Sequence, residues 1–126
     1  PLAAIIKAIK HERFLEHQVS DFVKRLKKVM NIKITDGKIV GKVSDYFKSE
    51  LGRATVLDQH VNKPAYVVTD IKAAVHSYIA GNPNVKPDPA TWGADHSKIE
   101  AGVLEIYGKA RRGTDMPNRF KKLKAK

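Results

Sequence analysis

Residues 2–30 of this sequence contain neither glycine nor proline. Their apolar side chains recur every three or four residues, which is the spacing of an amphipathic helix. Few folds other than a helical one can use so long an uninterrupted stretch of this period. It therefore predicts a mostly α protein whose chain begins with a long helix.

This predicted helix carries two apolar stripes that do not share a phase. The first stripe is Leu2, Ile5, Ile6 and Ile9. The second stripe is Leu15, Val19, Phe22, Val23, Leu26, Val29 and Met30. At about 100° per residue, the second stripe is rotated by roughly 100° from the first. Either the helix bends near residues 11–14, or its first turns pack on something other than their own core. We favour the second interpretation, an N-terminal helical arm that reaches a neighbouring subunit.

The period changes in residues 31–43, NIKITDGKIVGKV. Apolar and polar residues alternate there, and Asp36-Gly37 is a dipeptide that two-residue hairpin turns prefer. We expect a small β-hairpin with this dipeptide as its turn and with Ile34 opposite Ile39.

Three further helices are expected, over residues 44–61, 64–81 and 97–110. The first can be capped by Ser44 or Asp45, and the last by a capping box that joins Ser97 to Glu100. The second begins at Pro64 and ends near Gly81, although residues 66–69 (YVVT) can also form a short strand.

Residues 82–96 contain three prolines and the only tryptophan, Trp92. Such a composition favours a long extended connection. Trp92 either anchors this loop on the core, which we prefer, or packs on a neighbouring copy of the chain. The predicted fold is thus mostly α, with about four helices. It consists of a basic N-terminal helical arm (residues 1–30), a helical core (31–110) that holds the hairpin 31–43 and the Pro-rich loop 82–96, and a basic C-terminal tail (111–126).

Charge is the strongest global feature of these 126 residues, which fit one domain. The net charge is +11 and the isoelectric point is about 9.9. Residues 109–126 contribute +7 and residues 1–30 contribute +4, whereas residues 31–108 are neutral. Two basic ends around a neutral middle create a positive field that attracts polyanions, nucleic acid before an anionic membrane surface.

Both basic ends also have simpler explanations. The tail can be a solubilising end, and the lysine face of the first helix can be an ordinary solvated surface. Arginines in the tail favour phosphate, which their planar fork binds, and Phe120 and Leu123 indicate that the tail docks partly on the protein. We expect nine side chains to contact phosphates: Lys10, Arg13, Lys24, Lys28, Arg111, Arg112, Arg119, Lys121 and Lys122.

Other kinds of site have little support in the sequence. The chain has no cysteine, and its five histidines show no metal-binding spacing. No nucleophile motif, P-loop or dinucleotide fingerprint occurs, and no apolar run is long enough to span a bilayer. We therefore expect no catalytic residues, no metal and no cofactor.

The small, cysteine-free, strongly basic helical chain with an apolar and basic arm over residues 2–30 resembles the major coat proteins of filamentous and rod-shaped viruses of hyperthermophilic archaea. The resemblance implies a capsid subunit in the virion that pairs with itself or a paralogue and wraps A-form double-stranded DNA in a helical filament. Two alternatives stay open: a cytoplasmic RNA-binding ribosomal or ribosome-associated protein, and a winged-helix-like DNA-binding regulator whose wing is the hairpin with Lys33, Lys38 and Lys42.

Overall fold

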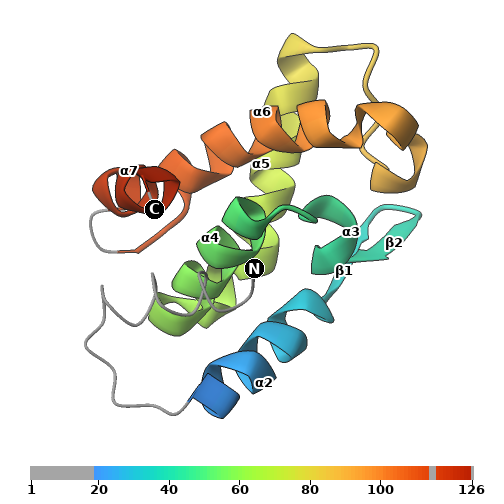
Figure 1. The fold of residues 1–126 in the computed structure, drawn as a ribbon. Coiled ribbons are helices and arrows are strands. Elements are labelled where there is room, and N and C mark those ends of the chain that lie inside the picture. Colours follow the sequence, from blue (N-terminus) through green and yellow to red (C-terminus); the bar gives the residue numbers. More distant parts are fainter. Residues whose placement is uncertain (1–18, 114–115, 126) are drawn as a thin grey trace.

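A computed structural model of the chain describes residues 19–113 and 116–125 (Figure 1). Within these ranges it contains six α-helices and one two-stranded antiparallel hairpin. In chain order the elements are α2 (Val19–Met30), β1 (Lys33–Asp36), β2 (Ile39–Lys42), α3 (Val43–Tyr46), α4 (Glu50–Asn62), α5 (Val67–Gly81), α6 (His96–Ala110) and α7 (Met116–Ala125). The mostly α class and the small hairpin are confirmed. The question of a bend or an arm near residues 11–14 lies outside the described residues.

The predicted count of about four helices is too low, for two reasons. The expected helix 44–61 is two helices, because Phe47 adopts an extended backbone and ends α3. Ser49 then begins α4 by accepting a hydrogen bond from the backbone N–H of Gly52 at 3.0 Å. The second reason is α7, which forms within the segment that was expected to be a tail. Residues 66–69 are not a strand, since α5 begins at Val67 after a 3-10 turn at Pro64–Tyr66.

The hairpin has a different register from the one expected. Its turn is Gly37-Lys38 rather than Asp36-Gly37, so that Asp36 pairs with Ile39 and Ile34 pairs with Gly41. Gly37 has a φ of +63°, a conformation that suits glycine at the first turn position. The Asp36 carboxylate lies 2.8 Å from Nε2 of His76 on α5, which holds Asp36 within the strand.

Helix α4 lies at the centre of the fold, in contact with α2, α5, α6 and α7 (Figure 1). Helices α5 and α6 contact each other and cross in the view of Figure 1, and the Pro-rich loop connects them. The largest side chains that this arrangement buries almost completely are Tyr46, Phe47, Ile34, Leu57, Ile71, Tyr107, Met116 and Phe120. The core therefore draws on every part of the described chain, including α7.

Trp92 anchors the Pro-rich loop on the chain's own core. Its indole is buried and donates a hydrogen bond from Nε1 to the carbonyl oxygen of Lys86 at 2.8 Å. It also meets the ring of Tyr46 edge-on, with ring centroids 5.9 Å apart. Of the two roles considered for Trp92, the anchoring role is the one observed in this chain.

Candidate nucleic-acid interface

The nine residues expected at a phosphate-binding site do not form one surface in the described structure. Lys10 and Arg13 lie outside the described residues. Lys24 and Lys28 lie on α2, and the other five belong to the C-terminal segment around α7. Both elements pack on α4, but the cations of the two elements have different environments.

Arg111 is buried, with only 2% of its surface exposed. Its Nη2 atom lies 3.1 Å from Oδ2 of Asp58, and its Nη1 atom donates to the carbonyl oxygen of Gly108. Burial lowers the pKa of Arg111, and the neighbouring Asp58 carboxylate opposes that shift. A guanidinium enclosed in this way is out of reach of a phosphate group. The expectation that Arg111 contacts phosphate is therefore wrong for this fold.

Arg119 binds the same carboxylate from α7. Its Nε atom donates to Oδ2 of Asp58 at 3.1 Å, and its Nη2 atom pairs with Oδ1. Asp58 itself is only 1% exposed. One buried carboxylate on α4 thus joins two guanidinium groups of the C-terminal segment. Removing one partner of such a buried group leaves a charge without compensation, so this triad ties the segment to the core.

Arg112 pairs with Asp70, which lies in the first turn of α5. Its Nη2 atom lies 2.9 Å from Oδ1 of Asp70, and its backbone N–H donates to Oδ2 at 2.8 Å. The guanidinium also stacks over the ring of Tyr66, 3.8 Å from the ring centroid. Half of the Arg112 side chain remains exposed. Its charge is nevertheless paired with Asp70, and its guanidinium plane is stacked on Tyr66.

Helix α7 docks on the core through Met116, Phe120 and Leu123, which are all buried. The expectation that Phe120 and Leu123 dock is confirmed. Residues 116–125 form a packed helix rather than an extended tail. Gly108 on α6 makes room for this contact, since a Cβ atom there would lie 2.4 Å from the Phe120 ring.

Helix α7 carries three further lysines, and Lys109 lies in the last turn of α6. Lys124 lies 3.0 Å from Glu105 on α6, and Lys109 lies 3.3 Å from the same carboxylate. The hydrogen bond from Lys124 and that from Lys109 lower the pKa of Glu105. Lys121 and Lys122 are exposed. Both lie on the surface of α7, where their side chains are accessible to solvent.

Helix α2 presents the opposite situation. Leu26 and Val29 are buried against the core, while Lys24, Lys27 and Lys28 are exposed. Among the side chains of residues 23–113 and 116–125, no acid forms a recorded ion pair with these three lysines. The expected basic face of α2 is thus available to solvent, and Lys27 belongs to it although it was not among the nine expected residues.

Arg25, the remaining cation of α2, binds His60 at the far end of α4. Its Nη1 atom lies 3.1 Å from Nδ1 of His60. Because a guanidinium can only donate, the imidazole must accept at Nδ1 and is therefore neutral. Burial lowers the pKa of His60, and the charges of Arg25 and Lys28 lower it further.

The signal for the buried pairs was present in the sequence but was missed. Asp58 lies four residues after Ala54 and one residue after Leu57, so that in a helix it shares the side of these apolar residues. An acid on such a face requires a charged or hydrogen-bonding partner. In a chain with 24 lysines and arginines, a buried ion pair is the expected consequence.

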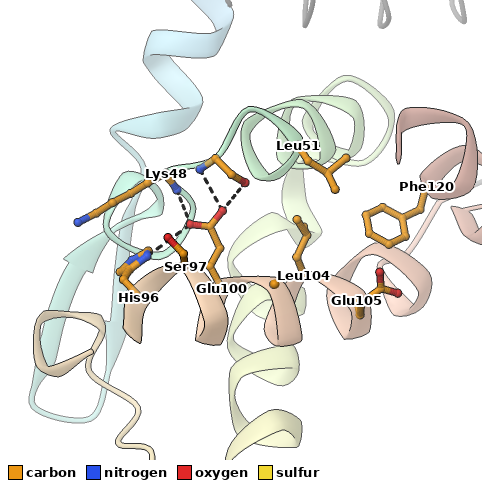
Figure 2. Close-up of a pocket in the computed structure, with 10 residues that line it drawn as sticks. Lys48, Leu51, His96, Ser97, Glu100, Leu104, Glu105 and Phe120 are labelled. Atoms are coloured by element: carbon orange, nitrogen blue, oxygen red, sulfur yellow. Dashed lines mark hydrogen bonds and ion pairs between the residues drawn. The ribbon is translucent and has the colours of Figure 1, made fainter. Parts of the chain in front are cut away.

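A cavity of about 450 Å³ lies between α6, α7 and the start of α4 (Figure 2). At one end, the carboxylate of Glu100 accepts hydrogen bonds from the backbone N–H groups of Lys48 and Ser49, at 2.8 and 3.0 Å, and from the Ser49 hydroxyl. At the other end lie the apolar side chains of Leu51, Leu104 and Phe120 (Figure 2). The predicted capping box is therefore wrong, because Glu100 binds the N-terminus of α4 and does not turn back to its own helix.

Glu100 is engaged with three donors, which leaves the rest of the cavity lining mainly apolar. This arrangement stabilises the junction of α4 and α6 and suits an apolar side chain better than an ionic ligand. His96 contacts the carbonyl oxygen of Asp45 at 2.7 Å, and its Nδ1 atom lies 3.5 Å from Oε1 of Glu100 (Figure 2). His76 contacts Asp36 at the hairpin. No group of three or more histidine, aspartate or glutamate side chains suited to a metal ion occurs within the described ranges.

None of the helices described is both long and apolar enough to cross a bilayer. Comparison of the chain with protein-family models, with curated proteins and with solved structures found no match.

Proposed function

We propose that this chain is a non-enzymatic structural protein that packages nucleic acid through phosphate contacts and does not read the base sequence. The observation that carries the proposal is the exposed face of α2. Lys24, Lys27 and Lys28 project from it, and no described acidic side chain neutralises them.

The charge balance of the described side chains supports this proposal. Residues 23–113 and 116–125 contain twenty lysines and arginines but nine aspartates and glutamates. Three of those acids, Asp58, Asp70 and Glu105, are paired with C-terminal cations. The remaining excess of positive charge is carried mostly by exposed lysines, which attract a polyanion over a distance set by the ionic strength.

The residue types at this surface favour contact with phosphate over contact with base edges. Lysine is a flexible point charge, whereas bidentate recognition of guanine in the major groove uses arginine most often. The arginines 111, 112 and 119 are engaged with carboxylates of the chain itself. Binding by the lysines that remain would position the nucleic acid without discriminating its sequence.

The more specific form of the proposal is a capsid subunit of a virion. In this form the chain pairs with itself or a paralogue and wraps double-stranded DNA in a helical filament. Its support is the resemblance to coat proteins of archaeal filamentous and rod-shaped viruses, together with a physical argument. A few weak phosphate contacts on each subunit give strong binding when neighbouring subunits repeat them along one polymer.

Binding of a labelled 30-base-pair duplex of random sequence, measured by fluorescence anisotropy between 50 and 200 mM salt, tests the proposal. The variant K24Q/K27Q/K28Q should lower the slope of log affinity against log salt by about 2.7, because about 0.9 is lost for each phosphate contact. The matched control K63Q/K86Q/K98Q removes the same charge from exposed lysines elsewhere and should change the slope less. Equal effects of both variants, or no binding by the unaltered protein, would contradict the proposed interface.

Electron microscopy of the protein mixed with long double-stranded DNA tests the capsid form. We expect continuous helical filaments of constant diameter. Small complexes of fixed size with folded RNA would favour the ribosomal alternative, and a sharp footprint on one duplex sequence would favour the regulator.

A further inference from the structure

The solvent face of the hairpin is a second exposed basic surface, and it lies outside the nine expected residues. The observed register sets Lys33 opposite Lys42 and Thr35 opposite Val40. Because side chains alternate across a strand, these four residues share one face, while Ile34 between them is fully buried. Lys38 lies in the turn at the tip of the hairpin. We call this surface, made by Lys33, Thr35, Lys38, Val40 and Lys42, the hairpin face.

Two like charges oppose each other on the hairpin face. Residues directly opposite in an antiparallel pair have Cβ atoms about 4.5–5.5 Å apart, and like charges in such a pair are unfavourable. Lys33 and Lys42 are both exposed, and neither side chain has a recorded ion-pair partner within the described residues. A bound anion between or beside the two ammonium groups would relieve their repulsion.

The acids close to the hairpin already have partners of their own. Asp36 belongs to the opposite face, where its carboxylate lies 2.8 Å from His76 of α5. Asp45 accepts a hydrogen bond from the backbone N–H of Lys42 at 2.8 Å, at the start of α3. The hairpin face itself carries no acidic residue.

Val40 adds an apolar contact to this basic surface. It is 64% exposed, more than any other large apolar side chain in the described part of the chain. A single exposed valine is ordinary by itself. Here, however, it lies two residues from Lys38 and two from Lys42 on the same face, so an anion that binds both lysines must pass over it.

The hairpin holds this face in a fixed position. Ile34 is buried in the core, Asp36 contacts His76, and the backbone N–H of Val43 donates to the carbonyl oxygen of Ile32 at 3.0 Å. The hairpin also follows directly after α2, whose last turn carries Lys27 and Lys28. In Figure 1 it projects at the edge of the molecule, at the right of the view, away from α7 at the left.

We propose that the hairpin face is a second contact for duplex nucleic acid, in addition to α2. Lys33, Lys38 and Lys42 bind backbone phosphates, and Val40 packs on the apolar side of the sugars between them. This inference rests on the proposed function and deepens it by adding a surface. A membrane is a poorer fit, because one valine offers too little apolar area to anchor a hairpin in a bilayer.

The test uses the full chain and the same labelled duplex. The variant K33Q/K38Q/K42Q should reduce the salt slope by about 2 to 3, so that the loss of affinity between 50 and 200 mM salt becomes about 40-fold smaller than in the unaltered protein. V40T keeps the β-branched shape and the charge. It should weaken binding by up to about tenfold with no change in the salt slope, because it removes only an apolar contact.

Folding is checked by thermal unfolding of each variant. The triple hairpin variant should unfold at the temperature of the unaltered protein or slightly above it, since it loses the repulsion between Lys33 and Lys42. The K63Q/K86Q/K98Q variant serves again as the control for a general loss of charge.

The outcomes separate this inference from the proposed function. If the α2 variant weakens binding while the triple hairpin variant equals the K63Q/K86Q/K98Q control, the hairpin face is not a contact, and the proposed function stands. If the unaltered protein does not bind duplex at all, the proposed function fails and this inference fails with it. Hairpin-dependent binding to phosphatidylserine vesicles, without hairpin-dependent binding to duplex, would also overturn the inference.

Discussion

Helix α2 and the C-terminal segment 111–125 are similar in sequence and different in the fold. Both are rich in cations and carry an apolar stripe at helical spacing. Arg111, Arg112 and Arg119 of the C-terminal segment are neutralised by Asp58 and Asp70, whereas Lys24, Lys27 and Lys28 of α2 have no described acidic partner. A cluster of positive charge in a sequence can thus form ion pairs that stabilise the fold, or it can stay exposed as a binding surface. The positions of the aspartates and glutamates in the fold decide between the two.

The largest effect on stability is expected at Asp58, whose carboxylate binds Arg111 and Arg119 of the C-terminal segment. Replacement Asp58→Ala leaves Arg111 buried without its anion and should lower the free energy of unfolding by about 3–5 kcal/mol. Chemical denaturation followed by circular dichroism measures this loss. Asp95→Ala is the matched control, because Asp95 is an exposed acid whose carboxylate accepts no recorded hydrogen bond from the described residues. Equal stability of the two variants would mean that the triad does not hold α7.

A smaller loss of stability is expected from a substitution that adds a side chain at the contact between α6 and α7. In Gly108→Ala, the new methyl group meets the Phe120 ring, so that the helix-propensity gain of about 1 kcal/mol is outweighed and stability falls by about 1–3 kcal/mol. Gly81→Ala in α5 is the control, since a Cβ atom there would meet nothing within 4 Å. If Gly108→Ala is as stable as Gly81→Ala, α7 does not pack on α6 through Phe120.

The contact of α2 with α4 should depend on pH through His60. Its pKa is lowered in the folded chain by burial and by Arg25 and Lys28, so the unfolded chain binds the proton more readily. The resulting stability is complete above about pH 6.5, the pKa of an unperturbed histidine, and is lost as the pH falls towards the lower pKa of the folded state. Denaturation at pH 7.5 and 5 measures this loss.

His60→Gln is the variant that isolates this contribution. Glutamine can still accept a hydrogen bond from Arg25, but it does not titrate. The variant should therefore lose less stability between the two pH values than the unaltered protein does. An identical loss in both proteins would place the pH dependence elsewhere.

The smallest effect on stability is expected on the face of α2. K24Q/K27Q/K28Q removes three exposed charges that have no described partner, so the free energy of unfolding should change by less than about 0.5 kcal/mol. The same denaturation experiment measures it. A loss of unfolding free energy near that of Asp58→Ala would show that these lysines stabilise the fold, as the C-terminal arginines do. The two regions would then not differ in the role of their cations.

Local patterns predicted much of this fold. The apolar spacing along the chain predicts the helix over residues 19–30 and helix α5. Local sequence also predicts the hairpin that follows residue 30 and the docking of Phe120 and Leu123. Errors occurred where a contact from elsewhere competed with a local one. Glu100 binds the start of α4 and not its own helix, and Asp36 stays in its strand beside His76, which moves the turn to Gly37-Lys38.

The candidate site was less predictable than the fold, because it depends on partners that are distant in sequence. Arg111 and Asp58 are 53 residues apart, and Arg112 and Asp70 are 42 apart. The number of charges in each part of the sequence does not indicate which lysines and arginines form ion pairs with distant carboxylates. Lys33 and Lys42 were visible as lysines of a hairpin, but only the observed register places them opposite each other beside an exposed Val40.

The sequence by itself determined the helical class, the hairpin and the excess of positive charge, because these depend on composition and on the spacing of neighbouring residues. Only the tertiary structure decided which of the charges remain exposed. Packing brings distant carboxylates against some cations and leaves others in water, and the cost of burying an unpaired charge makes that division definite.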